Sequence, residues 1–249
     1  MSSVKHAMIA RDRSNLPLEN GSIGPVRLDE RCFGKVQAMT RLQIRLATAS
    51  VTGIFLAGAR PAMAHHVMDG KLPQTVGEGL LSGLAHPIIG ADHFAFIVGV
   101  GLISQIARRL ALLPMLFLLG TVVGCFLHLQ GVNLPWSEAG VAISVGAAAA
   151  IVAMYRQIPT GILAILFAAS GVVHGYAYGE SIVGAETSSL LAYVIGFVAI
   201  QYGLAVGVGA AFGLIVERGH VSQPLIMRIA GGGIALGAVV SFASIIMAA

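Results

Sequence analysis

Six apolar stretches follow one another along the chain after residue 76, and short polar breaks separate them. They cover residues 77–104, 110–130, 137–155, 159–178, 187–216 and 224–248. A membrane-spanning helix needs roughly 17 to 25 mostly apolar residues, and each stretch meets that need. With 56% hydrophobic and 10% charged residues, the chain is also too apolar to cover itself in water. We therefore predict an all-α membrane protein, a bundle of about six transmembrane helices within 76–249.

Residues 39–64 have the layout of a cleavable secretory signal peptide. Two arginines precede an apolar stretch over 46–59, and the string Ala-Met-Ala at 62–64 forms a small-x-small cleavage pattern. Cleavage there makes His65 the first mature residue, at the start of a periplasmic linker over 65–75. The alternative is an uncleaved anchor helix.

The segment 1–38 is a polar extension that adds nothing a signal peptide needs, and translation from Met39 would omit it. Most of the positive charge lies in the first 64 residues, which hold nine Lys and Arg against four acids. From residue 65 onward there are six bases and seven acids, so nucleic acid is not expected as a partner.

The bases of the mature chain predict its orientation. With the mature amino terminus in the periplasm, alternate loops place five arginines on the cytoplasmic side and only Lys71 outside. This agrees with the positive-inside rule and with the cleavage site, so we predict the bacterial inner membrane. The arginines are Arg108, Arg109, Arg156, Arg218 and Arg228.

Three ionisable side chains lie in the first span, where each is costly and indicates a functional site facing the bundle interior. They are His86, Asp92 and His93. Pro87 and Gly90 lie between the histidines, so we expect the first helix to be broken near Pro87. Broken helices often line ion sites within membranes.

Other spans add possible metal ligands. His174 and Glu180 lie near the outer end of the fourth span, His128 lies in the second, and Glu138 begins the third. Imidazole and carboxylate together suit Ni²⁺, Co²⁺ or Zn²⁺. The simpler reading of His128 is an interhelical hydrogen bond, and Glu138 alone could be a solvated carboxylate. The pair His65-His66 could bind periplasmic metal or be an exposed accident.

Glycine pairs four residues apart predict close helix packing. They are Gly203 and Gly207, Gly209 and Gly213, and Gly233 and Gly237.

The string His86-Pro87-x-x-Gly90-x-Asp92-His93 resembles the motif of the HupE/UreJ family. His174-Gly175, with Glu180 after it, resembles a second motif of that family, and the likeness covers roughly 40–249. The resemblance implies a permease, not an enzyme, that supplies nickel, or cobalt in some relatives, to enzymes such as hydrogenase or urease. It also implies an acidic ligand at Glu138 and no tightly bound cofactor.

Two other functions are open at this point. A haem-binding membrane anchor would use intramembrane histidines as axial ligands, but it does not explain Asp92. An intramembrane hydrolase lacks support, because neither G-x-S-x-G nor H-E-x-x-H occurs. The oligomeric state is open, with a homo-oligomer or a partner chain both compatible with the sequence.

Overall fold

The computed structural model describes residues 71–218 and 222–248, and this part of the chain contains seven helices. The predicted signal peptide and the polar extension lie outside the described residues and stay predictions. The helices are α2 (Val76–Ile89), α3 (Ala91–Ile106), α4 (Leu112–Leu129), α5 (Ser137–Met154), α6 (Thr160–Glu180), α7 (Thr187–Glu217) and α8 (Gln223–Ala248).

The predicted all-helical membrane fold is confirmed. Each of α4 to α8 is long and apolar enough to cross a membrane, and α2 with α3 makes a sixth span if the bent pair is counted as one. The six predicted spans agree with the observed helices within two residues at every end. The extent of each apolar stretch was sufficient to predict where its helix begins and ends, because the helix must cross the hydrocarbon region of the bilayer.

The first span is broken at Gly90, three residues later than the predicted position near Pro87. Pro87 lies inside α2, and α2 and α3 meet at an angle of 79°. Gly90 has an extended backbone, with φ −69° and ψ 104°. A Cβ atom on Gly90 would lie 2.7 Å from Cδ2 of His93, so a residue with a side chain would push that imidazole away.

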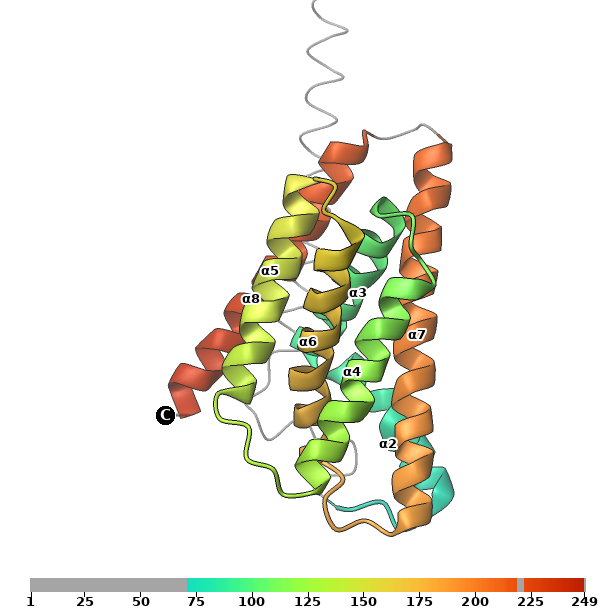
Figure 1. Ribbon diagram of the computed structural model, residues 1–249, viewed down its shortest axis with the longest axis vertical. Helices are drawn as coiled ribbons and strands as arrows, with labels where there is room; N and C mark the ends of the chain where they lie inside the picture. The colour runs from blue at the N-terminus through green and yellow to red at the C-terminus, as the bar shows by residue number, and fades with distance from the viewer. Residues whose placement is uncertain (1–70, 219–221, 249) are drawn as a thin grey trace, which may run out of the picture. The chain divides into compact units, whose positions relative to one another are not determined.

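Helix α3 lies in the middle of the described bundle. It packs against α7, α5 and α8, and its buried Phe96 contacts the rings of Phe117 on α4 and Phe167 on α6. The long helix α7 packs along both α2 and α3 and so bridges the break (Figure 1). The other main pairs are α4 with α6 and α5 with α8.

Helices α4 and α6 approach closely through glycines. A Cβ on Gly124 would lie 2.0 Å from the carbonyl oxygen of Val172, and one on Gly175 would lie 2.0 Å from that of Thr121. Both helices carry small residues four apart at this contact, a pattern the sequence analysis overlooked.

The predicted glycine pairs behave differently from one another. A Cβ on Gly209 would lie 2.7 Å from the carbonyl oxygen of Gly101, so this glycine does pack against α3. Gly203 and Gly207 do not pack against another helix within the described part of the chain. Both are exposed, and nothing lies within 4 Å of a Cβ built on either.

The connections between helices separate the charges. Those after α3 and α5 lie at one end, together with the end of α7, and carry Arg108, Arg109, Arg156 and Arg218 (Figure 1). Those after α4 and α6 lie at the other end, which has Glu138, Glu180 and Glu186 at or beside the helix termini. We call these the basic end and the acidic end.

Candidate metal site

Three histidines from three helices meet beside the helix break. His86 on α2, His93 on α3 and His174 on α6 are 3%, 4% and 0% exposed. The ring of His93 lies 5.9 Å from that of His86 and 5.0 Å from that of His174. Nδ1 of His93 and Nδ1 of His174 are 2.8 Å apart, which is a hydrogen-bond distance. We call these three residues the histidine cluster.

The ring of His174 is held on its face and on its edges. Phe96 stacks on it with ring centres 4.5 Å apart, and Phe117 meets it edge to face at 5.8 Å. Oγ of Ser144, on α5, lies 2.8 Å from Nε2 of His174. Two further helices, α4 through Phe117 and α5 through Ser144, therefore contribute to the surroundings of the cluster.

His86 contacts two hydroxyl groups. Its Nδ1 lies 3.1 Å from the hydroxyl of Tyr193 on α7 and 3.2 Å from that of Ser181, which follows α6. Both hydroxyls also donate to the carbonyl oxygen of Tyr178, each at 3.0 Å. The ring of Tyr178 packs against the rings of both His86 and His93, at 5.1 Å and 4.5 Å.

Asp92 lies in the first turn of α3 and is half-buried. Its Oδ1 accepts the backbone N–H of His93 at 2.8 Å, and its Oδ2 accepts the hydroxyl of Ser241, on α8, at 3.1 Å. A carboxylate at a helix amino terminus is stabilised by the helix dipole. Asp92 is thus held both by its own helix and by the last helix.

The cluster lies at one depth in the bundle. Ser144 is seven residues from the start of α5, His174 is six from the end of α6, and Tyr193 is six from the start of α7. At about 1.5 Å per residue, these positions are roughly 9 to 11 Å from the acidic end. In a bilayer whose hydrocarbon boundary coincides with these helix ends, this depth would be inside the hydrocarbon region, where ionisable groups are costly.

The other predicted ligands lie apart from the cluster. Glu180 and Glu138 are exposed at the acidic end. His128 is half-buried near the end of α4, with its ring 4.4 Å from that of Tyr176, and its Nδ1 is buried without a hydrogen-bond partner in the structure. The structure therefore brings together His86, His93 and His174 with Asp92 close by, but not the remaining three. We call Glu138, Glu180 and His128 the outer group.

The sequence analysis missed the hydroxyl groups around the cluster. Ser144, Ser181, Tyr193 and Ser241 come from different parts of the chain, and serine is common in membrane helices at packing contacts. No spacing pattern connects them to the histidines, so only the packing of helices reveals their role.

In this structure the side chains of the histidine cluster are not arranged as a metal site. Among the described residues, no group of three or more His, Cys, Asp or Glu side chains has the geometry of a formed metal site. Two imidazole nitrogens bound to one ion at about 2.1 Å each stand roughly 3.0 Å apart at a right angle and roughly 3.4 Å apart at the tetrahedral angle. Both separations exceed the 2.8 Å between the two Nδ1 atoms. Metal binding therefore requires a small movement of the His93 or His174 ring.

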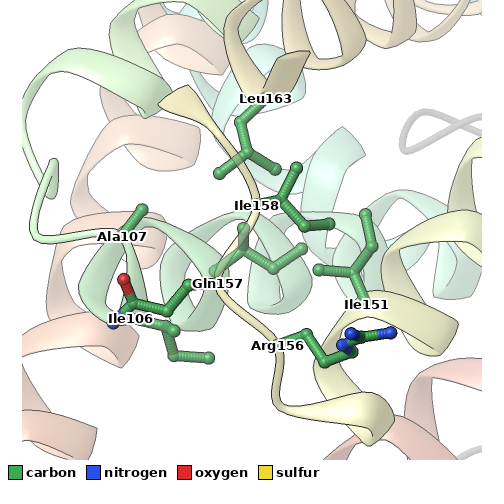
Figure 2. Close-up of a pocket in the computed structure, with 8 residues that line it drawn as sticks. Ile106, Ala107, Ile151, Arg156, Gln157, Ile158 and Leu163 are labelled. Carbon is green, nitrogen blue, oxygen red and sulfur yellow. The ribbon is translucent and has the colours of Figure 1, made fainter. Parts of the chain in front are cut away.

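Figure 2 shows a separate pocket at the basic end. It is lined by the ends of α3 and α5, the start of α6 and the connection between α5 and α6. Its polar residues are Arg156 and Gln157, and its other lining residues are apolar. None of the predicted metal ligands lines it, so this pocket is distinct from the candidate site.

Comparison with known proteins gives a consistent result. Residues 53–241 match the model of a protein family described as HupE/UreJ protein. The chain is also similar to Protein HupE of Rhizobium leguminosarum bv. viciae, with 31% identity over 192 residues, 76% of this chain and 94% of that protein. No solved structure matches. On this evidence, the chain belongs to the HupE/UreJ family.

Proposed function

We propose that this protein is a secondary permease that carries a divalent transition metal, nickel or alternatively cobalt, across the inner membrane. Its cargo would supply metalloenzymes such as hydrogenase or urease, the role that the family resemblance implies. The observation that carries the proposal is the meeting of three buried imidazoles from three helices at a helix break, with a carboxylate beside them.

The chemistry of these donors favours a borderline metal ion. Neutral imidazoles bind Ni²⁺, Co²⁺ and Zn²⁺ well, whereas Mg²⁺ and Ca²⁺ prefer oxygen ligands throughout. Neutral imidazoles add no positive charge to that of the ion. The carboxylate of Asp92 offsets part of the charge of the ion. The proposed ligands in the bundle are His86, Asp92, His93 and His174.

The proposed route runs from the acidic end to the basic end. Carboxylates at the entrance, Glu138 and Glu180, raise the local concentration of cations. The arginines of the basic end lie in the cytoplasm under the positive-inside rule, so the acidic end faces the periplasm. No G-x-x-x-x-G-K-[ST] loop occurs in the sequence, so the energy comes from the membrane potential, a coupled ion or a partner ATPase.

The arrangement of the cluster favours an ion over haem. Two axial ligands of one haem lie on opposite faces of the porphyrin ring. His93 and His174 instead touch through Nδ1 atoms 2.8 Å apart, and Phe96 covers a face of His174. A small ion needs only a slight separation of these rings, whereas haem needs the helices to move apart.

Uptake of radioactive nickel into cells tests the proposal. Cells that express the wild-type protein should accumulate nickel at low external concentration, and an uncoupler should reduce this accumulation. Asp92→Asn should lower the initial rate by more than the roughly 10- to 100-fold that follows loss of an outer-shell partner, because a ligand itself is removed. Glu217→Gln, a carboxylate change at the basic end, should leave the rate unchanged.

Protein amounts in the membrane must be equal for this comparison. Wild-type uptake no greater than that of empty cells, or full uptake by Asp92→Asn, would contradict the proposal. A panel of divalent ions as competitors distinguishes nickel from cobalt as the main cargo.

A further inference from the structure

His174 is 0% exposed, and each of its two ring nitrogens lies within hydrogen-bond distance of another polar atom. Nδ1 faces Nδ1 of His93 at 2.8 Å, and Nε2 faces Oγ of Ser144 at 2.8 Å. A neutral imidazole carries one N–H and one lone pair. The position of this single proton therefore determines which nitrogen can bind a metal ion.

Oγ of Ser144 lies 2.7 Å from the backbone carbonyl oxygen of Val141 as well as 2.8 Å from Nε2 of His174. A carbonyl oxygen can only accept, so both contacts are hydrogen bonds only when Ser144 donates its one proton to Val141, as serines in helices commonly do, and accepts from His174. In that arrangement Nε2 of His174 carries the proton, and Nδ1 carries the lone pair, which accepts N–H from Nδ1 of His93.

The ring cannot easily exchange its two nitrogens by rotating. Phe96 stacks on it with an angle of 29° between the planes, and Phe117 meets it at 81°. Since protein interiors are close-packed, turning the ring over requires both phenylalanines to move. The proton position, rather than the ring orientation, is thus the variable that Ser144 controls.

We propose that Ser144 is a positioning residue that fixes His174 in the Nε2–H form, so that Nδ1 is the atom that binds the transported metal. The proposal rests on the proposed function. Nδ1 faces His93 and the helix break, whereas Nε2 faces α5. An arriving ion takes the lone pair of Nδ1 and displaces the N–H of His93 from it. His93 can bind the same ion through its Nε2, or through Nδ1 once its proton has moved to Nε2, and the bond from Nε2 of His174 to Ser144 persists throughout.

Nitrogen-15 NMR of the full chain in lipid nanodiscs tests the proton position directly. Histidine is labelled, and the His174 signals are identified by their loss in His174→Asn. At about pH 8 an ordinary histidine is neutral, so the two nitrogens give separate signals for N–H and lone pair. We expect the wild-type protein to show Nε2–H, and Ser144→Ala to show a large share of Nδ1–H.

Calorimetric titration with nickel chloride provides a second readout. Ser144→Ala should raise the Kd about tenfold, the lower limit for losing a partner of a metal ligand. Ser144→Thr, which keeps the hydroxyl, should restore both the proton position and the Kd. Ser104→Ala is the matched control, because Ser104 is also buried in a helix and donates to a backbone carbonyl, that of Val100, at 2.6 Å.

The two readouts separate the possible failures. Wild-type His174 in the Nδ1–H form, or Ser144→Ala with unchanged NMR signals, would overturn the role of Ser144 whatever the protein transports. Absence of nickel uptake by the wild-type protein would instead overturn the proposed function, and the NMR result would still decide the Ser144 inference.

Discussion

The histidine cluster and the outer group both consist of predicted metal ligands but differ in their surroundings. The rings of His86, His93 and His174 are buried and contact one another, about 10 Å inside the acidic end. Glu138 and Glu180 are exposed to their surroundings at that end, and His128 packs on Tyr176 outside the cluster. A buried donor costs free energy unless it is satisfied, whereas an exposed donor costs little. The cluster therefore requires a functional explanation, whereas the exposed carboxylates of Glu138 and Glu180 do not.

The largest expected effect concerns the helix contact that positions the cluster. A Cβ at Gly175 would collide with the backbone of Thr121, so Gly175→Val must force α4 and α6 apart. We expect destabilisation beyond the roughly 1 to 3 kcal/mol of ordinary overpacking, with loss of folded protein. Fluorescence-detected size exclusion after heating in detergent measures it. Gly203→Val is the control and should retain wild-type thermal stability, since nothing lies within 4 Å of its Cβ position. Equal melting of both variants would show that the close approach is unimportant.

The next effect compares a histidine of each region. His174→Ala removes a proposed ligand, and nickel uptake should fall to the level of empty cells. His128→Ala should keep at least about half of the wild-type rate, because His128 lies outside the cluster and its buried Nδ1 has no hydrogen-bond partner in the structure. Initial rates of radioactive nickel uptake, corrected for protein amount, measure both. The comparison fails if the two variants lose uptake equally.

A smaller effect compares two tyrosines. Tyr193→Phe removes a hydroxyl beside Nδ1 of His86, so the KM for nickel should rise about tenfold while the maximal rate changes little. Tyr176→Phe removes a hydroxyl that bonds the backbone of Val132 and Leu134 at the acidic end, and its KM should stay within about twofold. Uptake measured over a range of nickel concentrations separates KM from maximal rate. A lower maximal rate in Tyr193→Phe with unchanged KM would argue against an orienting role.

The smallest effect concerns the entrance. Glu180 is exposed, so Glu180→Gln should raise the KM only about two- to threefold at low ionic strength, through weaker attraction of the cation. The effect should disappear at about 0.5 M salt, where charges on the surface are screened over a few ångström. Uptake assays in vesicles at both salt concentrations test this. A loss that persists at high salt would place Glu180 among the direct ligands and weaken the distinction between the two regions.

Much of the fold could be predicted because a bilayer imposes a simple length rule. Every predicted span agrees with an observed helix within two residues at each end. The break in the first span lies between His86 and His93, as expected. Its position is Gly90, whereas the prediction was near Pro87. Position 90 suits glycine for a local reason: the ring of His93, three residues further on, occupies the space that a Cβ at position 90 would need.

Helix faces were harder to predict than helix lengths. In a soluble bundle, apolar residues mark the buried face, but in a membrane they also face lipid. Ile143 and Ile165 are 70% and 74% exposed, while Ile97 and Ile103 are 0% and 2% exposed. The sequence therefore does not distinguish the lipid-facing side from the interior, and the glycines of α4 and α6 were overlooked for the same reason.

By itself, the sequence determined that this chain forms membrane helices, where they begin and end, and which side chains are too costly to be accidental. The tertiary structure decided which of those side chains meet, since His93 and His174 are 81 residues apart and are brought together by the packing of both α3 and α6 against α4 and α5. It also placed Ser144, Tyr193 and Ser241 around them. The physical reason is that the length of a helix depends on a local run of apolar residues, whereas a binding site depends on contacts between helices that are distant along the chain.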